Sequence, residues 1–205
     1  MIIRPANNTT DIPHIARFVK LAGPSIYPYL FEYQKDLHSE NVIEAMALHP
    51  KSTVFYKNCL MAEIDGVVAG GVVTAPAHIR KKADRYILPI GMSFLKKRYW
   101  LRYIYRLLQI SRFSPLKDTM SIESIGVFPE FQRQGICTRL LDVVADRAVE
   151  AGFSAISLEV WANNSPAVAA YKKYGFTIVK QSSYVLKAYN KQGIYYMKKV
   201  LDPEE

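Results

Sequence analysis

The pattern of apolar and polar positions predicts a chain in which strands and helices alternate. In the C-terminal half, the runs at 119–128 and 155–161 read as strands. Each is followed by a stretch with the period of an amphipathic helix, at 136–151 and 165–174. The apolar residues expected on one face of the first of these helices are Ile136, Leu140, Leu141, Val144 and Ala148.

The same reading places further elements on both sides of this region. The N-terminal part is predicted to hold a strand at Met1–Arg4, a helix at Asp11–Leu21, a short helix at Asn41–Leu48, and a hairpin of Thr53–Ile64 with Val67–Thr74. The hairpin turns at Asp65 and Gly66, a dipeptide typical of tight turns. Two final strands are expected near Thr177–Lys187 and Ile194–Leu201.

A long segment, residues 75–118, interrupts this alternation. Structureless loops of this length are uncommon inside compact domains, so we expect a helix over Ser93–Ser111. On that helix Arg98, Arg102 and Arg106 recur every four residues as an arginine stripe. The apolar residues expected on the opposite, packed side are Trp100, Leu101, Ile104, Leu107 and Leu108.

Length and composition favour one soluble domain over residues 1–205. The chain of 205 residues can bury a full core, and no apolar run approaches the roughly 18 residues that span a bilayer. The sequence begins with a strand-like segment and without the apolar core of a signal peptide. Its two cysteines, Cys59 and Cys137, form neither a disulfide framework nor a metal site, and the four histidines show no ligand spacing. We therefore expect a cytoplasmic protein without a metal.

The net charge of +9 is concentrated in the segment 75–118. Residues 79–117 contain eleven basic residues and one acid, Asp84, a net charge of +10, while the remaining 16 basic and 17 acidic residues give −1. Three interpretations of the arginine stripe stay open: a solvated helix face, a wall that attracts a negatively charged substrate, or contact with an anionic membrane or nucleic acid. Of the last two partners, the sequence argues more against nucleic acid than against peripheral membrane contact.

The turn after the strand at 119–128 has the composition of an anion site. Residues 128–138 read Phe-Pro-Glu-Phe-Gln-Arg-Gln-Gly-Ile-Cys-Thr and lead directly into the helix at 136–151. The first N–H groups of a helix have no intrahelical partner, and with the helix dipole they favour phosphate. Gly135 allows close approach of an anion, and Arg133 adds a positive charge. An ordinary strand-to-helix turn would explain the same residues.

A second motif in the right order favours the anion site. After the strand at 155–161, Asn164, Ala167, Tyr171, Gly175 and Phe176 are spaced along the next helix and its end. Together with Gln132-Arg-Gln-Gly-Ile-Cys137, this pattern resembles the GCN5-related N-acetyltransferase (GNAT) superfamily. The resemblance is strong over residues 119–180, and in the N-terminal part it rests on element order alone. Cys137 stands where that family has a small residue.

The resemblance implies an α+β fold with α/β/α layers. Its mixed, mostly antiparallel sheet would have splayed fourth and fifth strands, flanked by helices, with acetyl-CoA wedged between the two strands as acyl donor. The residues that it implies for binding acetyl-CoA are Ile125, Gly126, Val127, Gln132, Arg133, Gln134, Gly135, Ile136, Cys137, Thr138, Asn164, Ala167 and Tyr171. A bulge near Gly126 would turn the N–H of Val127 towards the thioester carbonyl.

Acetyl transfer also requires proton transfers. A primary amine is mostly protonated at neutral pH and must lose a proton, while the departing thiolate must gain one. We expect Tyr171 to donate to the thiolate and Glu123, on the fourth strand, to accept from the amine, with Glu159 as a second candidate. Packing of Tyr171 on the sheet and simple exposure of Glu123 are the structural alternatives. Cys137 is expected to be a tolerated small side chain and not a nucleophile.

The predicted function is N-acetyl transfer from acetyl-CoA to a primary amine by direct attack in a ternary complex. A non-catalytic acyl-CoA-binding sensor or scaffold, and transfer of a longer acyl group, stay open. The acceptor is a small-molecule or peptide amine, which could carry negative charge, and the basic segment argues mildly against polycations. Either a monomer or a homodimer fits the sequence. His38 and His78 lie in segments that could line the acceptor site.

Overall fold

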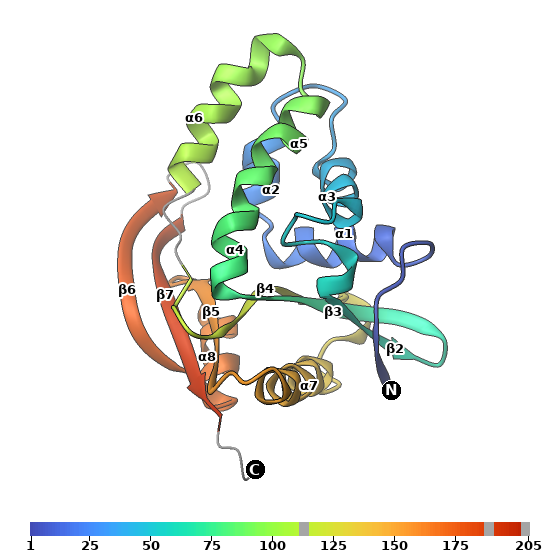
Figure 1. The fold of residues 1–205 in the computed structure, drawn as a ribbon, viewed down its shortest axis with the longest axis vertical. Coiled ribbons are helices and arrows are strands. Elements are labelled where there is room, and N and C mark those ends of the chain that lie inside the picture. The colour runs from blue at the N-terminus through green and yellow to red at the C-terminus, as the bar shows by residue number, and fades with distance from the viewer. Residues whose placement is uncertain (111–114, 187–190, 202–205) are drawn as a thin grey trace.

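The computed structural model describes residues 1–110, 115–186 and 191–201, and a twisted sheet lies at its centre (Figure 1). Within these residues seven strands are ordered β1-β2-β3-β4-β5-β7-β6. They are β1 Ile2–Pro5, β2 Cys59–Ile64, β3 Val67–Pro76, β4 Met120–Val127, β5 Ala155–Trp161, β6 Thr177–Leu186 and β7 Lys191–Val200. Neighbouring strands are antiparallel except for β4 and β5, which are parallel, and this confirms the predicted mixed sheet.

Strands β4 and β5 separate soon after they begin. Their parallel register covers only Met120–Ile122 against 156–158. Beyond Ile122, β4 stays paired with β3 on its other side, and β5 stays paired with β7 along its whole length. The two strands therefore splay apart towards their C-terminal ends, as expected, and the sheet opens at its centre.

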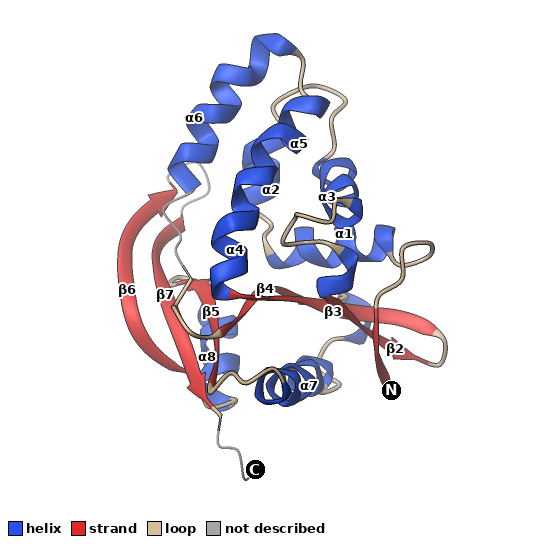
Figure 2. Ribbon diagram, in the orientation of Figure 1, coloured by secondary structure: helices blue, strands red, loops and turns tan. Residues whose placement is uncertain are grey.

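Helices cover both faces of the sheet, giving the expected α/β/α layers (Figure 2). One face carries α1 Ile12–Ala22, α2 Ile26–Phe31, α3 Ser39–Leu48, α4 Ala77–Ala83, α5 Ile87–Phe94 and α6 Trp100–Ile110. The other carries α7 Ile136–Glu150 and α8 Ser165–Lys173. All five residues predicted for the apolar face of α7 are buried, and they pack with residues of β4, β5 and β7 into one core.

The segment between β3 and β4 is helical, but its helices differ from the prediction. The helix expected over Ser93–Ser111 is instead two helices, because α5 ends at Phe94 and α6 begins at Trp100. Between them Leu95 is extended, and the indole N–H of Trp100 donates to the Leu95 carbonyl at 3.1 Å. This bond satisfies a carbonyl that a continuous helix would have used, so the break is stable. Ser111 lies outside the described residues.

The arginine stripe of α6 packs differently from the prediction. The guanidinium of Arg106 lies 4.5 Å from the ring centre of Tyr29 and 4.3 Å from that of Tyr33, and it donates to the Tyr29 carbonyl. Cation–π contacts of this kind hold α6 against α2 and the loop after it. In contrast, Leu101 and Leu108 are exposed, so the expectation that they face the core was wrong.

Two smaller predictions in the N-terminal half were also wrong. Helix α2 was not expected, and residues 53–58 form turns and a short 3₁₀ segment, Tyr56–Asn58, before β2 begins at Cys59. The side-chain amide of Asn58 donates to the Thr53 carbonyl at 3.0 Å and so closes this turn. The turn at Asp65–Gly66 is where the pattern placed it, whereas the predicted strand end at Lys187 lies outside the described residues.

Candidate active site

A cavity of about 620 Å³ occupies the opening between β4 and β5. The carboxylate residues Glu123 of β4 and Glu159 of β5 line it from the two strands, and Tyr171 lines it from α8. The opposite wall comes from α4, α5, α6 and the region of α1 and α2, with apolar residues such as Ile87 and Leu107. The helical segment between β3 and β4 thus encloses the space that the splayed strands leave open.

A β-bulge directs Glu123 towards this cavity. Val73 of β3 pairs with Ser124 and Thr74 pairs with Ile122, so Glu123 has no partner in the ladder. An extra residue breaks the alternation of a strand, and the four consecutive residues Ile122–Ile125 all line the cavity. The bulge expected near Gly126 is therefore located at Glu123, and Gly126 itself pairs regularly with Gly71.

The role of Gly126 is close packing. A Cβ at this position would lie 2.8 Å from the backbone oxygen of Phe18 in α1, so only glycine allows the helix to approach the strand this closely. Phe18 is itself fully buried. Gly126 thus allows α1 to pack directly against β4, the strand whose residues 122–125 line the cavity.

An arginine joins the two carboxylates. Nη1 of Arg80, in α4, donates to Oε2 of Glu159 at 2.5 Å and to Oγ of Ser121 at 3.2 Å. Its Nε lies 2.8 Å from Oε2 of Glu123, an ion pair whose geometry falls short of a hydrogen bond. The side chains of Arg80, Glu123 and Glu159 are only 10–12% exposed. Two buried carboxylates therefore share one guanidinium.

This shared arrangement shifts the pKa of Glu123. Burial raises it, Arg80 lowers it, and the carboxylates of Glu159 and Asp84 raise it again, giving a pKa of about 8. Burial lowers the pKa of the Arg80 guanidinium, but the nearby carboxylates of Glu123 and Glu159 raise it by more, so the net shift is upwards. Glu123 is thus a carboxyl group that can change protonation state close to neutral pH, as a general base requires.

Backbone N–H groups of β4 also face the opening. The N–H of Phe128 donates to the Ala69 carbonyl at 2.8 Å, so at this position the donors point towards β3. Successive N–H groups along a strand point alternately to its two neighbours. The N–H groups of Val127 and Ile125 therefore point away from β3, towards β5. Since β5 pairs with β4 only as far as Ile122, these two donors face the gap between the strands.

The turn before α7 has the properties of an anion site. Gly135 has φ 76° and a Cβ there would meet nothing within 4 Å, while Arg133 has φ 63°. Gly135 caps the helix by its backbone alone, without a side-chain hydrogen bond. The first N–H groups of α7, at Ile136, Cys137 and Thr138, have no intrahelical acceptor. Residues 132–135 and Thr138 are exposed, so an approaching anion can reach these donors.

The structure separates the two tyrosines of α8 and its C-terminal end. Tyr171 lines the cavity, and burial raises the pKa of its phenol, so it carries its proton at neutral pH. The hydroxyl of Tyr174 instead donates to Oδ1 of Asp142 in α7 at 2.9 Å. Asn164 precedes α8 and lines the cavity, and its side chain does not cap the helix. Ala167 lines the cavity one turn later.

The residues expected to bind the cofactor therefore form two groups. Ile125, Asn164, Ala167 and Tyr171 line the cavity, whereas residues 132–135 and Thr138 lie at the surface where α7 begins, with the side chain of Ile136 buried beneath them. Val127, half-buried, lies between the two groups at the end of β4. Burial raises the pKa of the Cys137 thiol, which disfavours the thiolate and agrees with a packing role.

Sequence reasoning missed Arg80 and Tyr27. Arg80 was counted only as one of eleven basic residues, although it contacts both candidate bases from 43 and 79 positions away. Tyr27 lines the cavity from α2, a helix that the sequence did not predict. The basic residues that line the cavity are Arg80 and Arg85, and none of the three arginines of the stripe does so. His38 and His78 are likewise absent from the cavity wall.

The described residues offer neither a cluster of metal ligands nor a membrane-spanning helix. No group of three or more His, Cys, Asp or Glu side chains is arranged to hold a metal ion. No described helix is both long enough and apolar enough to cross a membrane.

Comparison with known proteins places this geometry in context. The model of the acetyltransferase (GNAT) family matches residues 24–176. The N-alpha-acetyltransferase of Sulfurisphaera tokodaii is 28% identical over 175 residues, which cover 83% of this chain and 77% of that protein. The ribosomal protein bS18-alanine N-acetyltransferase of Escherichia coli is 37% identical over 59 residues, 29% of this chain and 40% of that protein. The crystal structure of an N-acetyltransferase from Staphylococcus aureus Mu50 has the same fold, with a TM-score of 0.75 and 22% identity over 97% of this chain and 100% of that one.

Proposed function

Because the chain belongs to the acetyltransferase (GNAT) family, we propose that it transfers an acetyl group from acetyl-CoA to a primary amine by direct attack. The observation that carries the proposal is the cavity between β4 and β5, where two carboxylates, a protonated phenol and two outward-facing backbone donors meet. Acetyl-CoA supplies the activated thioester. The side chains and backbone of this chain then bind it, orient the amine and move two protons.

The proposed binding groups follow the geometry of the opening. The pyrophosphate lies against the N–H groups of residues 133–138, where Gly135 leaves the approach open and Arg133 adds charge. The backbone of Ile125–Val127 contacts the pantetheine arm, with Asn164 and Ala167 on the facing side. The N–H of Val127 donates to the thioester oxygen as that oxygen gains negative charge.

The proposed proton transfers use two residues of the cavity wall. Glu123, with a pKa of about 8, accepts a proton from the arriving ammonium group, directly or through water. Tyr171, whose phenol stays protonated, donates to the departing thiolate. Glu159 remains the second candidate for the base, because it lines the same cavity and shares Arg80 with Glu123.

The names of the relatives suggest where to look for the acceptor. By their names, the S. tokodaii protein is an N-alpha-acetyltransferase and the E. coli protein is an alanine N-acetyltransferase of ribosomal protein bS18. We therefore propose an α-amine at a peptide N-terminus as the first acceptor to test. The apolar wall formed by Ile87, Leu88 and Leu107 suits an apolar first side chain.

The decisive experiment is an acceptor screen that follows release of free thiol from acetyl-CoA. Peptides with free N-termini, amino acids, lysine-containing peptides and small amines are compared, and each product is identified by mass spectrometry. Repeating the screen with propionyl-CoA and longer acyl-CoA esters tests transfer of a longer acyl group. Tight binding of acetyl-CoA by calorimetry, with no acetylated product from any acceptor, would contradict the proposal and favour an acyl-CoA sensor or scaffold.

A further inference from the structure

The outer side of α6 carries a row of exposed apolar side chains. Leu101 and Tyr105 are four residues apart, so they lie on one face of the helix, and Leu108, one turn further on, also borders the cavity described above. Their exposed fractions are 84%, 62% and 64%. The opposite side of the helix carries Tyr103 and Ile110, which are buried in the core. A contiguous apolar face of this kind indicates a surface that meets something other than water.

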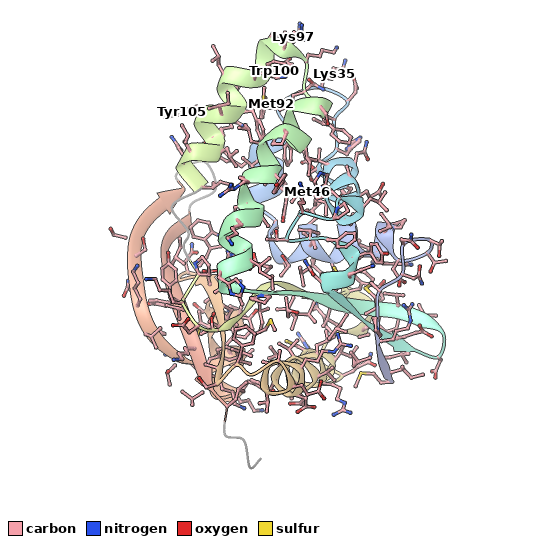
Figure 3. The ribbon with its side chains drawn as sticks, in the orientation of Figure 1. Lys35, Met46, Met92, Lys97, Trp100 and Tyr105 are labelled. Atoms are coloured by element: carbon pink, nitrogen blue, oxygen red, sulfur yellow. The ribbon has the colours of Figure 1, made fainter. Side chains whose placement is uncertain are left out.

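Positive charge surrounds this face. Lys96, Lys97 and Arg98 are exposed immediately before α6, and Arg102 is exposed within it. From residue 85 to residue 117 the sequence has eight basic residues and no acidic one, so no carboxylate of this segment neutralises them. Lys97 lies at the outer tip of the α5–α6 pair, and Tyr105 lies along the outer side of α6 (Figure 3).

The position of α6 leaves the face accessible. The α5–α6 pair forms one end of the molecule along its longest axis, away from α7 (Figure 1). The contacts that hold α6 in place are made by its inner side, through Tyr103, Trp100 and Arg106. The outer side is therefore not needed to keep the helix folded onto the body.

We propose that the outer face of α6 docks on the surface of an anionic lipid bilayer. An apolar stripe bordered by lysine and arginine is the composition of a helix that lies in the membrane interface, with its leucines among the acyl chains and its cations among the headgroups. A second copy of this chain fits less well, because a two-fold contact would bring two sets of these cations together. Nucleic acid fits less well because a phosphate backbone offers no apolar surface against which the exposed leucine could be buried.

Co-sedimentation with vesicles tests the proposal. The protein is mixed with vesicles of phosphatidylcholine alone, or with about one third phosphatidylserine, at low salt and at about 1 M salt. Binding is expected only with phosphatidylserine and is expected to fall with salt, because the Debye length shrinks from about 10 Å at 0.1 M to about 3 Å at 1 M. Lys97→Gln combined with Arg98→Gln should weaken binding about 25-fold, at about fivefold for each cation lost near the surface.

A second double variant tests the apolar part. Leu101→Gln combined with Tyr105→Gln should weaken binding on the order of tenfold or more, since both side chains would lose their burial in the bilayer. Neither residue lines the cavity and both are exposed, so the circular dichroism spectrum and the melting temperature should stay close to those of the wild type and confirm that the variant is folded. The matched controls are Val67→Gln with Val149→Gln for exposed apolar residues elsewhere, and Lys172→Gln with Lys173→Gln for cations on α8. Both controls should bind vesicles like the wild type.

The outcomes that would overturn the proposal are distinct. Equal binding to neutral and anionic vesicles would overturn the requirement for anionic lipid, and no binding to either would remove the membrane as the partner. Unchanged binding by the α6 variants, with loss in the α8 control, moves the docking surface elsewhere. A dimer seen by analytical ultracentrifugation that dissociates in Leu101→Gln with Tyr105→Gln would assign the face to contact between copies. None of these outcomes depends on whether the chain acetylates any acceptor.

Discussion

Replacing Glu123 by glutamine should change how the rate of acetyl transfer depends on pH. The amide keeps the shape of the side chain and removes its ability to accept a proton. In the wild type the Glu123 carboxyl has a pKa of about 8, so about a tenth of the molecules carry it ionised at pH 7. If ionised Glu123 takes the proton of an arriving ammonium group, kcat/KM rises about tenfold per pH unit until it levels off near pH 8.

The size of the effect follows from the amine's own pKa. The effect is largest for an acceptor of high pKa, so the assay uses a lysine-type alkylamine; a peptide α-amine, with a pKa of about 8, is already about one tenth neutral at pH 7 and would depend little on the base. An alkylamine with a pKa of about 10.4 is neutral in only about one molecule in 2,500 at pH 7. Without Glu123 the enzyme depends on this neutral fraction, so the variant's profile keeps rising to about pH 10. The loss should be on the order of 200-fold at pH 7, about 20-fold at pH 9, and small above pH 10. The assay is kcat/KM for one acceptor of known pKa over pH 6–10.

Glu159→Gln provides the matched control. The charge of Glu159 helps to raise the pKa of Glu123, and Arg80 is shared between them. Removing it leaves Arg80 to Glu123 alone, so the point where the wild-type profile levels off should move below pH 8. If the Glu123→Gln profile overlays the wild type, Glu123 is not the base. If the large loss instead appears in Glu159→Gln, the two roles must be exchanged.

Three further substitutions, and the stability of the Glu123→Gln variant, provide additional tests. Tyr171→Phe should keep acetyl-CoA affinity and lower turnover by about 10²-fold, measured where chemistry limits the rate, and an unchanged rate would return Tyr171 to packing. Gly135→Glu should abolish acetyl-CoA binding, because it adds a negative charge and places a side chain on a residue with a φ of 76°. Calorimetry on the folded variant measures the affinity, and a wild-type value would refute the assignment of this loop to the cofactor. Gly126→Ala should lower the melting temperature, since its Cβ would stand 2.8 Å from the Phe18 oxygen. Folding raises the pKa of Glu123 from 4.5 to about 8, because the folded protein favours its neutral form. The stability of the wild type relative to Glu123→Gln should therefore fall as pH rises from about 4.5 through 8. A difference in melting temperature that does not change with pH would contradict this.

Much of the fold could be predicted because its signals are local. The buried face of α7 follows from a period of about four residues, and the ends of β5 follow from a short apolar run between turn residues. The short helix α2 has no such signal, since six residues with a proline among them show no clear period. The break between α5 and α6 is held by the indole–carbonyl bond from Trp100 to Leu95 and by hydrogen bonds of the distant Gln34 with Phe94 and Lys96, and the local sequence pattern gives no sign of these contacts.

The residues of the site that belong to local sequence motifs could be predicted. Asn164, Ala167 and Tyr171 were found because one helix carries them at fixed spacing, and the structure brings them to one wall of the cavity. Arg80 could not be found in this way. Its contacts with Glu123 and Glu159 join α4 to two strands far along the chain, and they depend on where the segment between β3 and β4 folds back.

The charge of the chain shows most clearly why composition alone misleads about a site. The sequence places +10 in one segment, and an acceptor wall that attracts anions and repels polycations was one of the three interpretations that this concentration left open. In the structure Arg106 stacks on Tyr29 of α2, and Arg102 stacks on Tyr33 in the loop after α2. The charged residues that line the cavity are instead Arg80, Arg85, Asp84, Glu123 and Glu159. The cavity wall is therefore close to neutral, with Glu123 able to take either state near pH 8. Selection of the acceptor by charge must then act through these few buried groups, and the surface charge of α6 is left free for a different partner.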